Sequence, residues 1–344
     1  MKRFSIVFIF LALILAGSAI SWRYYHIIYG KNVPTLLDEE HLFIPTGTNY
    51  DTLLHILDKE GFLIDKHSFD KVAAWMKFKK DYMPPGRFRI IGGWSNRQLI
   101  QHLRSGNQDP VAVTFNNVRN VEELAGKISD YIEPDSFEFI NYLTNEPFLR
   151  SIGYSKETAL CLFIPNTYEL YWNTSMESLI HRMKIENEKF WAQNNRTAKA
   201  DALGLSKNEI YTLASIVEKE TLVSSEKRRI AGVYLNRLSR GIRLQADPTV
   251  VFAIGDFTIR RVLNKHLEFD SPFNTYLYTG LPPGPICMPE IETIDAVLTP
   301  EKHNYLYFCA EPGYAGAHAF AETLVGHLQN ARKYQRWLNQ QNIK

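Results

Sequence analysis

The sequence predicts an α+β protein with an N-terminal membrane helix, a small α+β module and a larger α+β domain. An uncharged apolar run opens the 344-residue chain, and strand-like segments in the first third are each followed by a turn and a capped helix pattern. Most of the remainder carries apolar residues at helical spacing. The composition, 45% hydrophobic and 22% charged, is typical of a globular protein. The net charge of +2 does not suggest a nucleic-acid partner.

The apolar run from Phe4 to Ser21 follows Lys2-Arg3 and is bordered by aromatic residues. Its length is near the lower limit for a helix that crosses a bilayer. Basic residues before the run predict a cytoplasmic tip, with the rest of the chain outside. A cleaved signal peptide that ends near Ala19 is the alternative. We favour a retained anchor over residues 1–25, followed by a linker over residues 26–40, and both interpretations export the remaining chain.

Three loose copies of a strand, a turn and a capped helix follow this linker. Their predicted strands are 43–45, 87–91 and 111–115, and the helices after them carry Leu53, Leu99 and Leu124 on their apolar faces. We expect the first two copies to form a small module over residues 41–110. This module could grip an extended ligand or serve only as a compact linker domain.

An intermediate region over residues 111–204 follows, and it is predicted to be mainly helical and irregular after residue 134. It contains an apolar and aromatic stretch over residues 162–172. Because exposed aromatic rings stack on sugar faces, Tyr168 or Trp172 is a candidate for carbohydrate binding. Burial in the core is the alternative for both rings.

A helix predicted over residues 210–221 carries the first candidate for chemistry. On a helical wheel Glu220 falls inside the apolar face, Glu218 lies at its margin and Lys219 points the opposite way. A carboxyl group among apolar neighbours resists ionisation, and a carboxylic acid protonated near neutral pH suits general acid catalysis of glycosidic cleavage. A solvated or ion-paired Glu at a helix end is the alternative.

Two polar loops follow a second amphipathic helix that begins near Ser224. In the first loop Asp247 precedes Pro248, which favours an extended or turn conformation, and this conformation would present Gln245, Asp247 and Thr249. The second loop contains Asn274 and Tyr276 and leads into a wall rich in proline and glycine over residues 280–286. A strand is predicted over residues 305–308, and a last helix is entered through the segment from His318 to His327.

The histidines and cysteines offer weaker signals. His303, His318 and His327 lack compact ligand spacing, so a metal enzyme is a minor alternative, and we expect no metal and no other cofactor. Cys161, Cys287 and Cys309 permit one disulfide but do not establish it.

The second half of the chain contains five motifs in order: Ala214-Ser-Ile-Val-Glu-Lys-Glu-Thr221, Leu244-Gln-Ala-Asp-Pro-Thr249, Asn274-Thr-Tyr276, Gly280-Leu-Pro-Pro-Gly284 and His318-x-Phe320-x-x-Thr323. Together they resemble the motifs of the endolytic murein transglycosylase family, the YceG-like proteins. The resemblance implies a LysM-like module and a catalytic domain, here residues 205–344, that cuts nascent peptidoglycan outside the cell membrane. It also implies that Glu220 is the essential acid. The chain departs from the family in carrying Asn166 where Asp is frequent, and Asn116-Asn117 where Glu-Gly is frequent.

The chemistry that the resemblance implies is lytic. Protonated Glu220 gives its proton to the oxygen between MurNAc and GlcNAc, and the C6 hydroxyl of the same MurNAc attacks C1 to leave a 1,6-anhydroMurNAc end. Because the nucleophile belongs to the substrate, no second carboxylate is needed. A hydrolytic muramidase would use two, and Asp247 is the candidate for the second.

The predicted glycan-binding residues are Gln245, Asp247, Thr249, Asn274, Tyr276 and Tyr168. For Asp247, capping of its own loop is the alternative role, and for the whole chain a non-catalytic peptidoglycan-binding scaffold is the alternative function. The expected partners are peptidoglycan glycan strands and the membrane, with cell-wall synthesis proteins as a further candidate. The expected location is the inner membrane, single-pass, with the catalytic domain in the periplasm.

Overall fold

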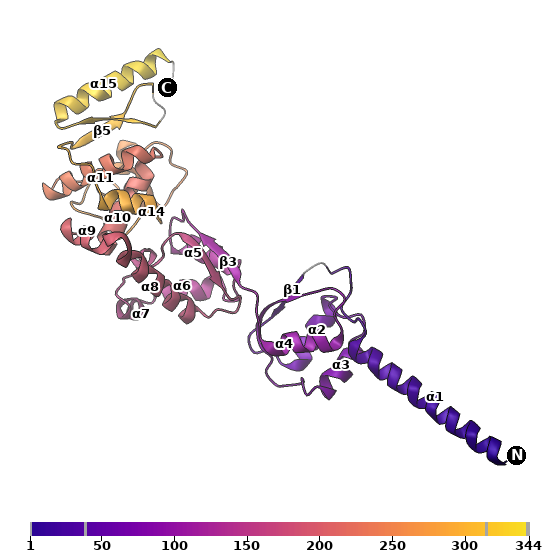
Figure 1. Ribbon diagram of the computed structural model, residues 1–344. Coiled ribbons are helices and arrows are strands. Elements are labelled where there is room, and N and C mark those ends of the chain that lie inside the picture. The colour runs from indigo at the N-terminus through magenta and orange to yellow at the C-terminus, as the bar shows by residue number, and fades with distance from the viewer. Residues whose placement is uncertain (1, 38–39, 314–315, 342–344) are drawn as a thin grey trace. The chain divides into compact units, whose positions relative to one another are not determined.

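The computed structural model (Figure 1) describes residues 2–37, 40–313 and 316–341 of the chain. It mixes helices with short two-stranded sheets, so the predicted α+β class is confirmed. The described chain divides into two compact units. The N-terminal unit runs to Ala112 and includes the short segments Tyr131–Glu133 and Glu169–Thr174. The C-terminal unit contains the rest, including most of the predicted intermediate region and the predicted catalytic region.

The chain begins with α1 (Lys2–Tyr29), in which Val7–Tyr29 is long and apolar enough to cross a membrane. The helix therefore extends beyond the predicted end of the anchor at residue 25. Residues after it do not form a free linker. The backbone oxygen of Ile27 accepts a hydrogen bond from Asn96, and Val33 is fully buried in the core of the N-terminal unit. Residues 38 and 39 of the predicted linker lie outside the described residues.

The N-terminal unit is built on one antiparallel pair of strands, β1 (Glu40–Ile44) and β2 (Gly86–Ile90). Two helices, α2 (Tyr50–Lys59) and α3 (Lys66–Trp75), lie between the strands in sequence, and α4 (Asn96–Ser105) follows β2. Asn49, Asp65 and Ser95 cap these three helices by accepting hydrogen bonds from backbone N–H groups. These elements agree with the predicted strand, turn and capped helix copies. The LysM-like character of the unit stays a prediction.

The remaining elements are numerous and mostly helical. They are β3 (Val111–Phe115), α5 (Val121–Ser129), α6 (Ser136–Thr144), α7 (Glu146–Ser151), β4 (Asn166–Leu170), α8 (Met176–Ala192), α9 (Arg196–Ala202), α10 (Lys207–Glu220), α11 (Ser224–Ser239), α12 (Asp247–Ile254), α13 (Asn264–Leu267), α14 (Ile291–Leu298), β5 (Tyr307–Ala310), β6 (His318–Ala321) and α15 (Leu324–Gln340). Short 3-10 turns occur at Ala159–Leu162 and Gln193–Asn195. Strand β3 pairs with β4, and β5 pairs with β6 in antiparallel register.

Helix α10 lies at the centre of the C-terminal unit. Ser206 and Glu209 form a capping box at its start, and every residue from Ile210 to Val217 is buried. The helix packs against α11 and α14, as Figure 1 shows. Burial on nearly all sides fixes the helix axis, so the position of its last residue, Glu220, is fixed as well.

Two local predictions are wrong. Asp247 and Pro248 do not form an extended loop but begin α12. Proline is tolerated in the first turn of a helix, where its missing N–H would have no partner, and an aspartate there interacts favourably with the helix dipole. Residues from His318 to Ala321 form β6 and not the start of the last helix, because β5 supplies a hydrogen-bonding partner, with Phe308 opposite Phe320. Thr323 then caps α15.

Candidate active site

A cavity of about 350 Å³ lies at the C-terminal end of α10. Its walls come from α10, α11, α12, the loops before α12 and after α13, β5 and α15. The lining residues are Glu220, Tyr234, Arg237, Leu244, Gln245, Asp247, Tyr276, Tyr307, Phe308, Leu324 and His327. Four residues predicted from the sequence, Glu220, Gln245, Asp247 and Tyr276, are therefore brought together.

Glu220 is half-buried, and its Oε1 accepts a hydrogen bond of 2.6 Å from the hydroxyl of Tyr234. Burial is the main cause that raises its pKa from the ordinary value of 4.5 to about 7, and the nearby charge of Asp247 raises it further. The bond from Tyr234 and the charge of Arg237 act in the opposite direction. A carboxyl group with this pKa is protonated in a large fraction of molecules at neutral pH and can donate its proton.

Arg237 is buried beside this acid and holds three parts of the wall together. Its Nε donates to the backbone oxygen of Leu306 at 2.6 Å, and its Nη1 donates to those of Leu244 and Arg243 at 2.9 and 3.1 Å. The guanidinium also lies 5.2 Å from the ring centroid of Tyr307. Arg237 therefore supplies a fixed positive charge near Glu220 while it fixes the loop before α12.

Asp247 and Tyr276 form the facing wall. The Tyr276 hydroxyl donates to Asp247 Oδ1 at 2.6 Å, which links the loop after α13 to the start of α12. Asp247 thus bridges to another loop, and its carboxylate remains exposed at the start of α12. Gln245 has a φ of 51°, in the left-handed region that non-glycine residues rarely adopt, and its N–H donates to the Thr275 oxygen at 3.1 Å. This backbone kink carries the Gln245 side chain to the cavity wall.

The sequence pattern of the YceG-like family matches residues 42–333. The chain belongs to the YceG-like family. The endolytic murein transglycosylase of Bacillus subtilis (strain 168) is 29% identical over 332 residues, which cover 89% of this chain and 89% of the relative. That of Streptococcus pneumoniae serotype 2 (strain D39 / NCTC 7466) is 26% identical, covering 90% of this chain and 61% of the relative.

A solved structure agrees with this membership. The crystal structure of a YceG-like protein from Listeria monocytogenes is 25% identical and superposes with a TM-score of 0.56, covering 85% of this chain and 98% of that chain. The resemblance stated from the five motifs is therefore confirmed at the level of the family.

Three predicted binding residues of the YceG-like chain do not line the cavity. Thr249 is fully buried, and its hydroxyl donates to the Ala246 oxygen at 2.7 Å. Asn274 is fully buried as well, with its Nδ2 donating to the backbone oxygens of Leu267 and Phe269 at 3.0 and 2.8 Å. Because buried side chains with satisfied polar groups do not reach a ligand, we expect both to shape their loops instead of touching a glycan.

Tyr168 lies elsewhere in the YceG-like fold. Its ring stacks on Phe115 with centroids 5.0 Å apart, and its hydroxyl donates to the Ile164 oxygen at 2.8 Å. The side chain is 5% exposed. Tyr168 is therefore packed in the core, which was the alternative to carbohydrate binding. Its position in β4 turns the ring inward, and the sequence pattern alone could not decide between the two.

Glu218 makes contacts within the protein that suit a structural role. Its Oε2 lies 3.2 Å from Lys227 Nζ and accepts a hydrogen bond from Thr293 on α14. Glu218 and Glu220 therefore contact different partners, Lys227 and Thr293 in the first case and Tyr234 in the second.

The three histidines have separate surroundings in the described parts of the chain. His318 pairs with Glu226 at 2.8 Å, and His303 Nε2 lies 2.9 Å from the Arg229 oxygen. His327 lines the cavity and stacks on Tyr307, with ring centroids 5.4 Å apart. Sequence reasoning did not assign His327 or Tyr234 to the site. A helical face that joins Tyr234 and Arg237, three residues apart, was the available signal.

Proposed function

We propose that this chain is an endolytic lytic transglycosylase that cleaves the MurNAc-β-1,4-GlcNAc bond of peptidoglycan strands and leaves 1,6-anhydroMurNAc ends. The observation that carries the proposal is Glu220, a half-buried acid with a pKa raised to about 7 at a cavity wall. Relatives that bear the name endolytic murein transglycosylase support the substrate class. Cleavage within nascent strands would limit or trim glycan polymerisation.

Glu220 acts first as an acid and then as a base in this proposal. Its proton passes to the glycosidic oxygen as the bond from that oxygen to MurNAc C1 breaks. The C6 hydroxyl of the same sugar forms a bond to C1, and its proton returns to the Glu220 carboxylate. Arg237 and the 2.6 Å hydrogen bond from Tyr234 stabilise the carboxylate that exists between the two proton transfers.

Asp247 does not need to activate water in a lytic reaction, because the attacking hydroxyl is part of the substrate. We assign it, together with Gln245 and Tyr276, to binding and orienting the glycan. Its carboxylate accepts a hydrogen bond from the Tyr276 hydroxyl. Its negative charge also lies at the cavity, where it would favour the positive charge that develops at C1 as the bond breaks.

We further propose that α1 is retained as a single-pass anchor, with the two units on the outer face of the cytoplasmic membrane, in the periplasm. The span Val7–Tyr29 and the basic residues Lys2 and Arg3 before it support this orientation. The substrate lies on that side, so proteins of the cell-wall synthesis machinery are the expected neighbours.

Product analysis tests the function. The full-length protein in detergent is incubated with isolated glycan strands, and the fragments are weighed by mass spectrometry. Ends that are lighter than a hydrolysed end by one water identify anhydroMurNAc, and Glu220→Gln is expected to lower the rate by about 10³-fold, as loss of a general acid does. Uncut strands would favour a non-catalytic scaffold.

Asp247→Asn separates the two chemistries. A lytic enzyme keeps measurable cleavage with anhydro products, because the carboxylate only orients the substrate. Products with reducing ends, lost entirely in Asp247→Asn, would instead identify a hydrolytic muramidase with two carboxylates.

A further inference from the structure

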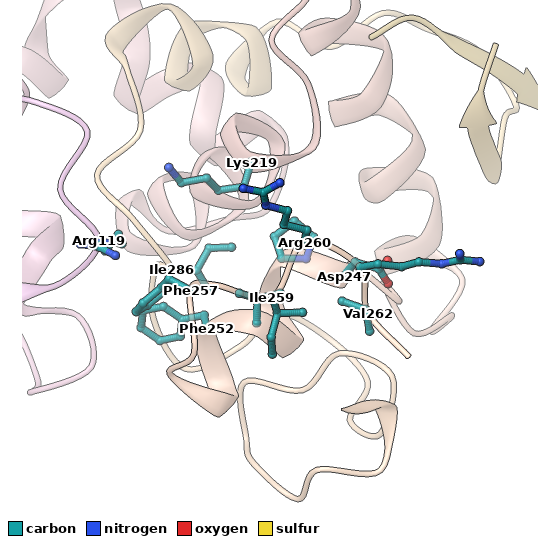
Figure 2. A pocket seen from close by; sticks show the side chains of 12 residues that line it. Arg119, Lys219, Asp247, Phe252, Phe257, Ile259, Arg260, Val262 and Ile286 are labelled. Carbon is teal, nitrogen blue, oxygen red and sulfur yellow. The ribbon is translucent and has the colours of Figure 1, made fainter. Parts of the chain in front are cut away.

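A second cavity, of about 490 Å³, is shown in Figure 2. Asp247 lines this cavity as well as the first. Four of its lining residues are cationic: Arg119, Lys219, Arg260 and Arg261. Asp247 is the one carboxylate among the lining residues. The second cavity therefore combines an excess of positive charge with a residue, Asp247, that also lines the Glu220 cavity.

The charges of Arg260 and Arg261 are available to a ligand. Asp247 Oδ1 already accepts a hydrogen bond of 2.6 Å from the Tyr276 hydroxyl. Arg119 pairs with Glu123 at 2.9 Å. Within the described residues, Arg260 and Arg261 are exposed and have no ion pair or side-chain hydrogen bond, and Figure 2 shows Arg260 extending toward Lys219. Four cationic side chains beside a single carboxylate favour an anionic ligand.

The opposite side of the cavity is apolar. Phe252 and Phe257 lie on it with rings 6.5 Å apart, and Ile259 and Ile286 extend it (Figure 2). A bare inorganic anion would leave this surface uncovered. In a peptide-bearing strand the lactyl carboxyl of the muramyl sugar is part of an amide, so the sugar itself offers no charge to the arginines. A short peptide with small apolar side chains and free carboxylates matches both parts of the lining.

We propose that the second cavity binds the carboxylate-bearing stem peptide of a muramyl residue next to the cleavage position. The inference rests on the proposed function, since it places the sugar chain in the Glu220 cavity and the attached peptide beyond Asp247. Lys219 and Glu220 are consecutive in α10 and line different cavities, so one helix end serves both parts of the substrate. Peptide-bearing strands are then preferred over bare glycan.

Binding measured without turnover tests this proposal. The full-length Glu220→Gln protein is titrated with three preparations of uncrosslinked strands: strands with intact peptides, strands freed of peptide by an amidase, and strands whose peptide carboxylates have been converted to amides. The same titrations are made after adding Arg260→Gln and Arg261→Gln. A matched control adds Arg240→Gln and Arg332→Gln, which remove two exposed arginines of the C-terminal unit that line neither cavity.

The expected result is about tenfold weaker binding of intact strands by the Arg260/Arg261 variant, as loss of charge-assisted hydrogen bonds predicts. Its binding of amidated strands should equal that of the control, and its loss on bare strands, whose only charge is the lactyl carboxylate that the amidase exposes, should be smaller than its loss on intact strands. Equal losses on all three strands, or no loss, would overturn the proposal. Because wild-type cleavage is measured separately, absence of cleavage with preserved peptide preference would refute the proposed function and leave the peptide site intact.

Discussion

Glu220 holds its proton because opposing effects at one carboxyl group leave a net penalty on its charged form. Burial and Asp247 raise its pKa, whereas Tyr234 and Arg237 lower it, and the balance is about 7. The two lowering groups are useful in catalysis, because they stabilise the carboxylate that must later accept a proton. Without them the pKa of Glu220 would lie higher still, and the acid would give up its proton less readily as the glycosidic bond breaks.

Tyr234→Phe should move the alkaline limb of the activity profile to higher pH. The hydroxyl donates to the carboxylate of Glu220 at 2.6 Å and so favours its charged form, and removing it raises the pKa of Glu220 further. The rate of cleavage against pH measures this shift. Tyr211→Phe is the control, since it removes a buried hydroxyl bonded to the Phe163 oxygen, away from Glu220. A limb that stays in place in Tyr234→Phe would contradict the assigned role.

The raised pKa of Glu220 also predicts how stability depends on pH. Between about 4.5 and 7 the folded protein keeps a proton that the unfolded chain has released, so the stabilising effect is complete below 4.5 and is lost as the pH rises through 7. Glu220→Gln should therefore gain stability relative to wild type over this window, by up to about 3 kcal/mol. Denaturant unfolding at several pH values measures it, with exposed Glu188→Gln as the control. A constant difference would show that Glu220 titrates normally.

At the scale of elements, the end of α10 affects the charge state of Glu220, and the two segments opposite it position the side chains that face Glu220. The C-terminal end of a helix carries partial negative charge, so a carboxylate at the last residue of α10 is further disfavoured in its charged form. The loops are held by buried polar groups: Thr249 and Thr275 hydroxyls lie 2.9 Å apart, and the Tyr276 N–H donates to Asn274 Oδ1 at 3.0 Å. These bonds fix Gln245, Asp247 and Tyr276 in front of Glu220.

Asn274→Ala should therefore lower the stability of the protein, whereas Gln245→Ala should weaken the binding of strands. Asn274 makes three hydrogen bonds inside the protein, and leaving their partners unpaired should cost about 2–4 kcal/mol of unfolding free energy. Gln245 is exposed, so its truncation should change stability by less than about 0.5 kcal/mol while it raises KM for strands. Thermal unfolding and steady-state kinetics of both variants provide the comparison. Equal stability of the two variants would refute the structural role of Asn274.

At the scale of the whole molecule, an apolar α1 precedes two separately packed units. The N-terminal unit has its own core, in which Leu42, Phe88 and Leu99 are fully buried. The C-terminal unit contains both cavities. The proposed chemistry therefore depends on one unit, and α1 is the candidate membrane anchor.

Deleting residues 1–25 should release the protein from membranes without abolishing cleavage. The full chain is expected to sediment with membranes and to resist extraction by high salt, since a span of this length inserts through burial of apolar surface. Fractionation and the mass of the mature protein measure both points. A full-length gene product that is recovered soluble and lacks its first residues would identify a cleaved signal peptide.

The sequence alone determined the class of fold and many of the element positions, and it predicted Glu220 as the acid. Periodicity and capping residues act locally, so Ser95, Asn49 and the apolar faces of the helices could be located without knowing any neighbour. The wheel position of Glu220 is local in the same way. The family motifs then added a substrate class that residue patterns could not supply.

Only the tertiary structure decided what each loop residue does. Thr249 and Asn274 look like ligands in a polar loop, yet the packing of one loop against the other buries them. Arg237, His327 and Tyr234 become site residues because α11, β5 and α15 meet at the end of α10. Such meetings are contacts between residues distant in the chain, and neither spacing nor local propensity encodes them. The position of Asp247 in the lining of both cavities likewise depends on contacts between distant residues.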